Sequence, residues 1–234
     1  RDAAHKFVSP PCSPFGACGD YRSIRFEGIP TFEAKVIEFA AMAGFVFKLV
    51  ASAPLVDGRP SVAVFPALVP ASHPLAAVRA ENNAVLVECD FLGPSVYLGR
   101  GAGGNPTASA VASDIGDLLL IYARAAGPAR SRDGGGSLVG GEADLYPAAE
   151  REYRYFFHLV TENRPGIWAT GTGLLASSGI NVESVHQKWI DRSLPSDLYV
   201  LVDPAREAAA RAALERIVAS PGIYRESRFY RILA

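Results

Sequence analysis

The sequence predicts a two-part protein of the α/β (α+β) class, in which a mixed-sheet domain precedes a smaller domain with the ferredoxin-like order βαββαβ. Hydrophobic residues make up 49% of the 234 residues and charged residues 20%, a composition that supplies a packed core. A Gly- and Pro-rich stretch over residues 126–150 lacks sustained periodicity, as exposed connections between domains do. We therefore expect one domain over residues 1–125 and a second over residues 151–234.

The first domain is predicted to contain a helix, three strands and a closing helix. Apolar residues recur at three- and four-residue spacing over Thr31–Ala43, which predicts a helix that Gly44 ends. Short apolar runs predict three strands, at residues 45–51, 61–65 and 84–89. A helical apolar stripe follows Pro106, a residue that is tolerated in the first turn of a helix because its missing N–H needs no partner there.

The second domain follows a different order. A β-rich run at residues 153–161 leads into the turn Arg164-Pro165-Gly166, and the periodicity then predicts a helix over residues 167–177. The remaining segments read as strand, strand, helix and strand, over residues 180–189, 197–203, 205–219 and 227–233. This order in about 80 residues is the split βαβ pattern of ferredoxin-like folds.

Charge, hydropathy and cysteine usage narrow the function classes. Lys plus Arg number 23 against 24 for Asp plus Glu, so neither nucleic acid nor an anionic membrane is expected as the main partner. The longest apolar stretch, Phe39–Phe47, is far shorter than the ~20 residues that a membrane-spanning helix needs. No Cys/His spacing typical of a metal site occurs, and the three cysteines are expected to be reduced thiols of a cytoplasmic protein.

The most specific glycine-rich motif is Gly99–Gly104, which satisfies the pattern GxGxxG. It follows a strand-like segment and lies at the start of the helix that is predicted around Pro106. A dinucleotide-binding fingerprint needs a second strand with an acidic residue about 20 residues further on, whereas here the helix runs into the Gly-rich stretch. Two readings stay open. The glycines allow a tight turn with close backbone approach, or they expose N–H groups at a helix N-terminus to a ligand.

Asp2 and Lys6 form a second candidate pair. They stand four residues apart in DAAHK, a segment with helical character, so both point to the same side of the helix. The spacing alone fits a surface ion pair. A lysine in suitable surroundings can also donate a proton to a developing alkoxide.

Several segments together resemble the substrate-binding part of homoserine dehydrogenases, in their order and spacing as well as in their residues. These segments are DAAHK (2–6), RSIRFEGI (22–29), AGFVFKLVA (43–51), VPASHPLAAVRAENNAVLVECDFLG (69–93) and GRGAGGNPTASAVASDI (99–115). Residues 151–234 resemble an ACT domain, through ENRPGIWA (162–169) and SSGINVESVHQK (177–188). The resemblance implies an N-terminally incomplete catalytic domain, a linker and an ACT regulatory domain, with the nucleotide-binding domain outside this chain.

The resemblance also implies the reaction, which is the NAD(P)-dependent interconversion of L-aspartate 4-semialdehyde and L-homoserine in threonine, methionine and isoleucine biosynthesis. Lys6 matches the family's catalytic lysine, and Asp2 matches an acidic residue of the substrate pocket. Gly103, with Gly101 and Ala102, matches the loop that approaches the nicotinamide end of NADP or NAD. Because the cofactor is expected to be bound mainly by the missing domain, this fragment alone is expected to be inactive.

The ACT resemblance implies L-threonine as a possible effector, bound around Asn163 and Gly166, and a homodimer formed by pairing of ACT sheets. Asn163 stands where ACT domains usually carry Asp. A rival hypothesis is a non-catalytic, amino-acid-binding ACT protein whose first domain is a remnant.

Overall fold

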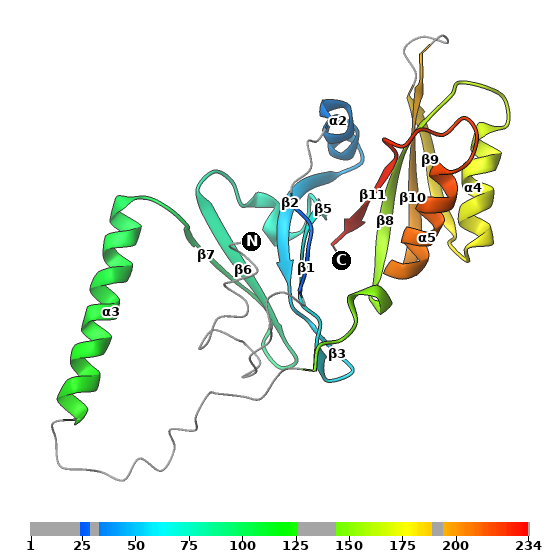
Figure 1. Ribbon diagram of the computed structural model, residues 1–234. Helices are drawn as coiled ribbons and strands as arrows, with labels where there is room; N and C mark the ends of the chain where they lie inside the picture. The colour runs from blue at the N-terminus through cyan, green and yellow to red at the C-terminus, as the bar shows by residue number, and fades with distance from the viewer. Residues whose placement is uncertain (1–23, 29–32, 126–143, 189–193, 234) are drawn as a thin grey trace. The chain divides into compact units, whose positions relative to one another are not determined.

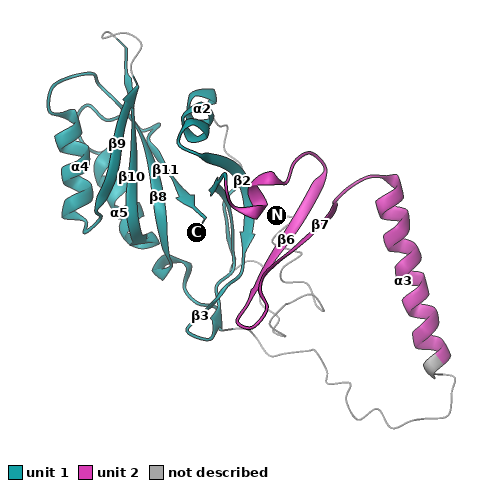
Figure 2. Ribbon diagram, turned by 180° about the vertical axis from the view of Figure 1, so that it is seen from behind, with its two compact units in different colours: residues 1–71, 138–234 teal, residues 72–137 magenta. Residues whose placement is uncertain are grey.

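A computed structural model of the chain describes residues 24–28, 33–125, 144–188 and 194–233 (Figure 1). Its contacts divide the chain into two compact units, residues 1–71 with 138–234 and residues 72–137 (Figure 2). Over the described ranges, no helix combines the length and the hydropathy needed to span a membrane.

The first unit is built on a mixed sheet, which has seven strands in the described part of the chain (Figure 1). β2 pairs with one edge of β5 along its whole length, and β1 and β11 pair with different parts of the opposite edge. From β11 the sheet continues in the order β8, β10 and β9. The strands are β1 (Arg25–Phe26), β2 (Phe45–Ser52), β5 (Ala63–Pro70), β8 (Glu152–Thr161), β9 (Val182–Lys188), β10 (Ser196–Arg206) and β11 (Arg228–Ile232). The sheet therefore continues from the first half of the chain into the second through the parallel pair β5 and β11.

The C-terminal part of this sheet is ferredoxin-like, as predicted. β8, α4 (Ile167–Ser177), β9, β10, α5 (Glu207–Val218) and β11 follow one another along the chain. The spatial order β11-β8-β10-β9 places the fourth strand beside the first and the third between the first and second, with antiparallel pairs throughout. We call residues 152–232 the C-terminal module.

Alternating side chains of this module enter two separate cores, because successive residues of a strand point to opposite faces of the sheet. Tyr155, Phe157 and Leu159 of β8 pack in one core with residues of α4 and α5. Phe156 packs in the other core, which residues of α2 (Ala34–Met42) cover. That second core joins both halves of the chain; its buried members are Val36, Phe39, Ala40, Leu68, Phe156, Tyr199, Tyr230 and Ile232.

In the first half, the predicted helix and strands occur with shifted bounds. The helix predicted over residues 31–43 is α2, and Gly44 follows it with a φ of 83°. The strand predicted at residues 61–65 is β5, which is longer and is central to the sheet. The short strands β3 (Leu55–Val56) and β4 (Arg59–Pro60) were not predicted; Asp57 and Gly58, both with positive φ, form their two-residue turn.

The predicted linker lies partly outside the described residues. Its end, residues 144–150, is described and includes the 3₁₀ turn η3 (Ala148–Glu150). The Tyr146 N–H donates to the Pro60 carbonyl at 2.9 Å, and the Arg59 guanidinium lies 3.6 Å from the Asp144 carboxylate. This end therefore contacts the β3–β4 hairpin.

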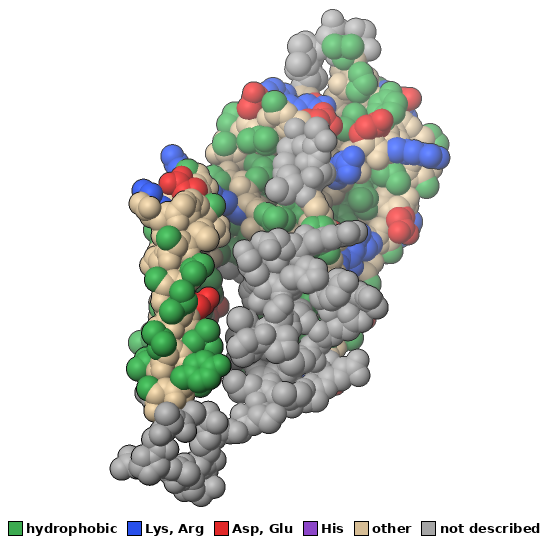
Figure 3. All heavy atoms as spheres, turned by 60° about the vertical axis from the view of Figure 1, so that its left-hand side comes forward, with side chains coloured by type: hydrophobic (Ala, Val, Ile, Leu, Met, Phe, Trp, Pro, Cys, Tyr) green, Lys and Arg blue, Asp and Glu red, His purple; other side chains and the backbone are tan. Residues whose placement is uncertain are grey.

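The second unit contains η2 (Pro74–Ala77), the antiparallel hairpin of β6 (Asn82–Cys89) and β7 (Gly93–Arg100), and α3 (Gly104–Ala125). α3 begins two residues before Pro106, which therefore lies in its first turn as expected. Large apolar side chains are exposed along α3 (Figure 3); they are Val111, Ile115, Leu118, Leu119, Leu120, Ile121 and Tyr122.

Candidate functional site

The two residues predicted to act on the substrate, Asp2 and Lys6, lie outside the described residues. The candidate residues that the structure does describe are those of the glycine turn before α3, of the turn before α4, and of the polar clusters of the sheet, and each group is described by itself. Among the described residues, no group of three or more His, Cys, Asp or Glu side chains could hold a metal ion.

The glycine turn Gly101–Gly103 connects β7 to the first residue of α3. The Gly101 N–H donates to the Glu81 carbonyl at 2.8 Å, and a Cβ on Gly101 would lie 2.0 Å from Asn83 Nδ2. An alanine at Gly101 would thus displace the Asn83 amide. This contact supports the close-approach reading for Gly101.

Gly103 meets a different requirement. Its φ of 122° is a conformation that residues with a side chain rarely adopt, and its carbonyl accepts hydrogen bonds from Thr107 N at 3.1 Å and Thr107 Oγ1 at 2.9 Å. The turn is exposed and precedes a helix of 22 residues, whose first N–H groups can bind a polar ligand group. The close approach at Gly101 and the exposed start of α3 occur in the same turn, so the two interpretations of the glycine motif do not exclude each other.

The turn between β8 and α4 contains the two predicted effector residues. Gly166 has a φ of 83° and precedes α4, and its carbonyl accepts the Thr170 N–H at 3.1 Å. Arg164 holds the turn by donating to Glu162 Oε2 and to the Pro221 carbonyl, both at 3.0 Å. Asn163 is exposed within this braced turn. The structure thus places Asn163 and Gly166 in one loop.

A chain of hydrogen bonds connects four elements at this end of the module. Thr161 Oγ1 and Ser196 Oγ, both buried, lie 3.0 Å apart, and Gln187 Nε2 donates to the same Ser196 oxygen at 2.9 Å. The Trp168 indole N–H then donates to Gln187 Oε1 at 3.1 Å. Sequence reasoning missed this chain because its members come from β8, α4, β9 and β10 and form no local motif.

A second polar group connects α2 to the module. The buried His158 Nε2 lies 2.7 Å from Asp197 Oδ1, and Lys35 Nζ lies 2.7 Å from the same oxygen and 2.9 Å from Glu33 Oε2. Burial alone would raise the pKa of Asp197, but hydrogen bonds from His158 and Lys35 outweigh burial and lower it. The His158 ring stacks on Tyr199 with 5.1 Å between centroids.

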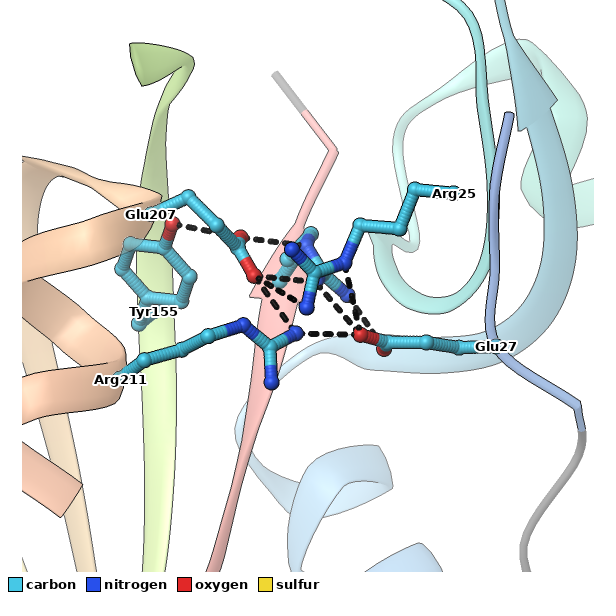
Figure 4. Close-up of polar contacts among 6 residues, drawn as sticks. Arg25, Glu27, Tyr155, Glu207 and Arg211 are labelled. Carbon is cyan, nitrogen blue, oxygen red and sulfur yellow. Dashed lines mark hydrogen bonds and ion pairs between the residues drawn. The ribbon is translucent and has the colours of Figure 1, made fainter. Parts of the chain in front are cut away.

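The most extensive charged group is the ion cluster of Arg25, Glu27, Glu207, Arg211 and Arg231 (Figure 4). Arg231, only 3% exposed, lies 2.7 Å from Glu27 Oε2 and 2.6 Å from Glu207 Oε1. Arg211 contacts both carboxylates, and Arg25 lies 3.2 Å from Glu27 and 3.6 Å from Glu207. Glu27 and Arg231 are 204 positions apart in the sequence, so no local pattern could reveal this cluster.

These contacts keep both carboxylates ionised. Burial alone would raise the pKa of Glu27, but the hydrogen bond and charge of Arg231, together with Arg211, lower it to about 2. The pKa of Glu207 is lowered for the same reason, against the effect of its burial. Burial and then the Glu207 charge raise the pKa of the Tyr155 hydroxyl, which donates to Glu207 Oε2 at 3.0 Å.

The described residues define an α+β protein with a ferredoxin-like C-terminal module and a glycine turn at the start of a long helix. The sequence model of the homoserine dehydrogenase family matches residues 1–115. A homoserine dehydrogenase of Corynebacterium glutamicum is 32% identical over 204 residues, which are 83% of this chain and 43% of that protein. One of Synechocystis sp. is 33% identical over 226 residues, covering 92% of this chain and 51% of that protein.

Solved structures agree with these matches. The crystal structure of a homoserine dehydrogenase from Thiobacillus denitrificans aligns with a TM-score of 0.85 and 27% identity, over 99% of this chain and 52% of that one. This chain belongs to the homoserine dehydrogenase family. It spans about half the length of the curated relatives it matches.

Proposed function

We propose that the longer family protein, of which this chain supplies the matching half, interconverts L-aspartate 4-semialdehyde and L-homoserine with NADP or NAD. The match over residues 1–115 carries the proposal, because it includes both DAAHK and the glycine turn. The likeness to the Thiobacillus denitrificans structure over almost the whole chain supports it.

Within this reaction, Lys6 is proposed to donate the proton that the substrate oxygen takes up, and its charge stabilises the developing alkoxide. Asp2 is proposed to hold the substrate's ammonium group or to orient Lys6. When bound, the nicotinamide supplies the hydride. Gly101, Ala102 and Gly103 would contact its end of the cofactor through backbone groups, because the turn is exposed and its two glycines have no side chain to hold the cofactor away.

The chain by itself is proposed to be inactive, because among the described residues the glycine turn follows β7 of a two-stranded hairpin and is not part of a dinucleotide-binding βαβ unit. The test is an assay of homoserine-dependent NADP or NAD reduction by this chain fused to the nucleotide-binding part of a relative. Turnover by the fusion and none by the chain alone is the expected result. A correctly folded fusion without turnover would contradict the proposal.

The C-terminal module is proposed to act as an ACT domain that binds L-threonine at the turn of residues 162–166. The braced loop, with a left-handed Gly166 at a helix start, supports this proposal because it presents fixed backbone groups. Calorimetric titration of the chain with L-threonine, and with L-alanine as a comparison, tests it. If the module binds an amino acid while the fusion shows no turnover, the rival non-catalytic reading is favoured.

The protein is proposed to form a homodimer through pairing of sheet edges. It is also proposed to be cytoplasmic. β9 is the outer strand of the module, and among the described residues no strand pairs with its outer edge. Such an edge can pair with a second copy. Sedimentation equilibrium of the full chain tests whether a dimer forms.

A further inference from the structure

One edge of β5 is shared by two strands from opposite ends of the chain. β1 pairs with residues 63–64 of β5 and β11 pairs with residues 67–68, both in parallel. β2 pairs with β5 along its entire length and therefore takes the other edge. The shared edge passes from β1 to β11 at residues 65–66.

The ion cluster lies at this point. Glu27 directly follows β1, and its N–H donates to the Val64 carbonyl at 2.8 Å. Arg231 is the β11 residue that pairs with Ala67. Its guanidinium lies 4.7 Å from the centre of the Phe65 ring and donates to the two Glu27 oxygens at 2.7 and 3.0 Å.

The same guanidinium also reaches α5. Arg231 donates to the two oxygens of Glu207, the first residue of α5, at 2.6 and 2.8 Å. The single buried side chain of Arg231 therefore connects the end of β1 to the start of α5. Pairing of a planar guanidinium with two carboxylates is directional, so it fixes position as well as adding attraction.

The backbone alone attaches β11 to β5 weakly. β11 pairs with β8 through five residues, 228–232, but with β5 through only two, followed by the hydrogen bond from Leu233 N to the Leu68 carbonyl at 2.8 Å. Strand pairs this short depend on side-chain contacts for their stability. The ion cluster provides such contacts at the junction.

The carboxylate oxygens of the cluster are satisfied, whereas the buried Nε of Arg211 has no hydrogen-bond partner among the described residues. All four carboxylate oxygens of Glu27 and Glu207 accept from donors of this chain, namely Arg25, Arg211, Arg231 and the Tyr155 hydroxyl. The carboxylates of the ion cluster therefore stabilise contacts within the chain, and none of their oxygens is left to accept a hydrogen bond from a ligand.

We propose that the ion cluster is a clasp that holds β11 against β5 and so fixes the end of β1 to the C-terminal module. The clasp is a property of this chain's fold and does not depend on the reaction proposed above.

The test is hydrogen–deuterium exchange of the full 234-residue chain with Glu27→Gln, which keeps the shape of the side chain and removes its charge. We expect peptides covering residues 25–28 and 231–233 to exchange about tenfold faster or more, because hydrogen bonds to a charged group are lost. Peptides from β8 and β10 should exchange within about twofold of the parent rate, because the module's own ladders are intact.

The matched control is Glu183→Gln, which removes a carboxylate from the exposed ion pair of Glu183 with Arg154. This control should leave exchange at residues 25–28 and 231–233 unchanged. The clasp is overturned if Glu27→Gln changes nothing at those residues, if it accelerates every peptide equally, or if Glu183→Gln has the same local effect.

Discussion

Lys6 is the residue on which the proposed chemistry depends most directly. In a fusion that contains a nucleotide-binding part, Lys6→Ala is expected to lower kcat about 10²-fold or more. The reason is that proton transfer by a general acid typically accelerates a reaction about 10²- to 10⁴-fold. Lys6→Arg should also be slow, since a guanidinium does not release its proton near neutral pH. Steady-state kinetics with L-homoserine measure both variants.

The control for this experiment is Lys188→Ala, which removes an exposed lysine that lies 3.6 Å from Glu38. It should leave kcat within about twofold of the parent, as surface ion pairs contribute little. If Lys6→Ala also had a kcat within about twofold of the parent, Lys6 would not be the catalytic lysine.

Glu27 shows how a single carboxylate makes stability depend on pH. Its pKa is about 2 in the folded chain and 4.5 in an unperturbed glutamate, so the folded state binds fewer protons than the unfolded state between these values. The stability that this ionised group contributes is fully present above pH 4.5 and is lost as the pH falls through 2. Urea unfolding between pH 6 and about 2.5 should therefore show a smaller loss of stability in Glu27→Gln than in the parent. Parallel curves for the two proteins would contradict this expectation.

At the level of elements, the turn before α4 allows a direct test of effector binding. Asn163→Asp is expected to lower the Kd for L-threonine several-fold, because a charge-assisted hydrogen bond to an ammonium group is roughly twice as strong as a neutral one. Calorimetric titration of the full chain measures this change. Asn105→Asp, the same substitution at an exposed position of α3, is the matched control. Equal Kd values for the parent and Asn163→Asp would place the effector site away from this side chain.

The elements also show which features a sequence can predict. α4 occupies the predicted residues 167–177 because left-handed glycines stand at both ends, Gly166 and Gly179. The βαββαβ order is confirmed because each segment has a clear period and a clear break. The two-residue strand β1 was missed, since such a strand has no period to detect and forms only through its partner β5.

The candidate site was less predictable for a related reason. The glycine turn and the loop around Asn163 are local, so motifs indicated them. The ion cluster and the hydrogen-bond chain from Thr161 to Trp168 bring together side chains from distant segments, and their residue types are ordinary for surface positions. Only the strand pairing, above all that of β11 with β5, makes them neighbours.

For the molecule as a whole, the continuous sheet predicts how the C-terminal module behaves when it is isolated. Residues 151–234 alone would lose α2 and β5, which cover Phe156, Tyr199 and Tyr230 on one face of the sheet. They would also leave the buried Arg231 without Glu27. An exposed apolar face and an uncompensated buried charge both destabilise a fold.

We therefore expect the isolated module to unfold at a lower temperature than the full chain or to associate through the uncovered face. Thermal unfolding followed by circular dichroism, together with sedimentation velocity, measures both outcomes. A longer fragment, residues 24–71 joined by a flexible linker to residues 144–234, retains α2, β5 and Glu27 and is the matched control. It should recover the Tm of the full chain, because it restores the second core and the ion cluster together. A monomeric module of residues 151–234 with the Tm of the full chain would show that the shared sheet contributes nothing to its stability.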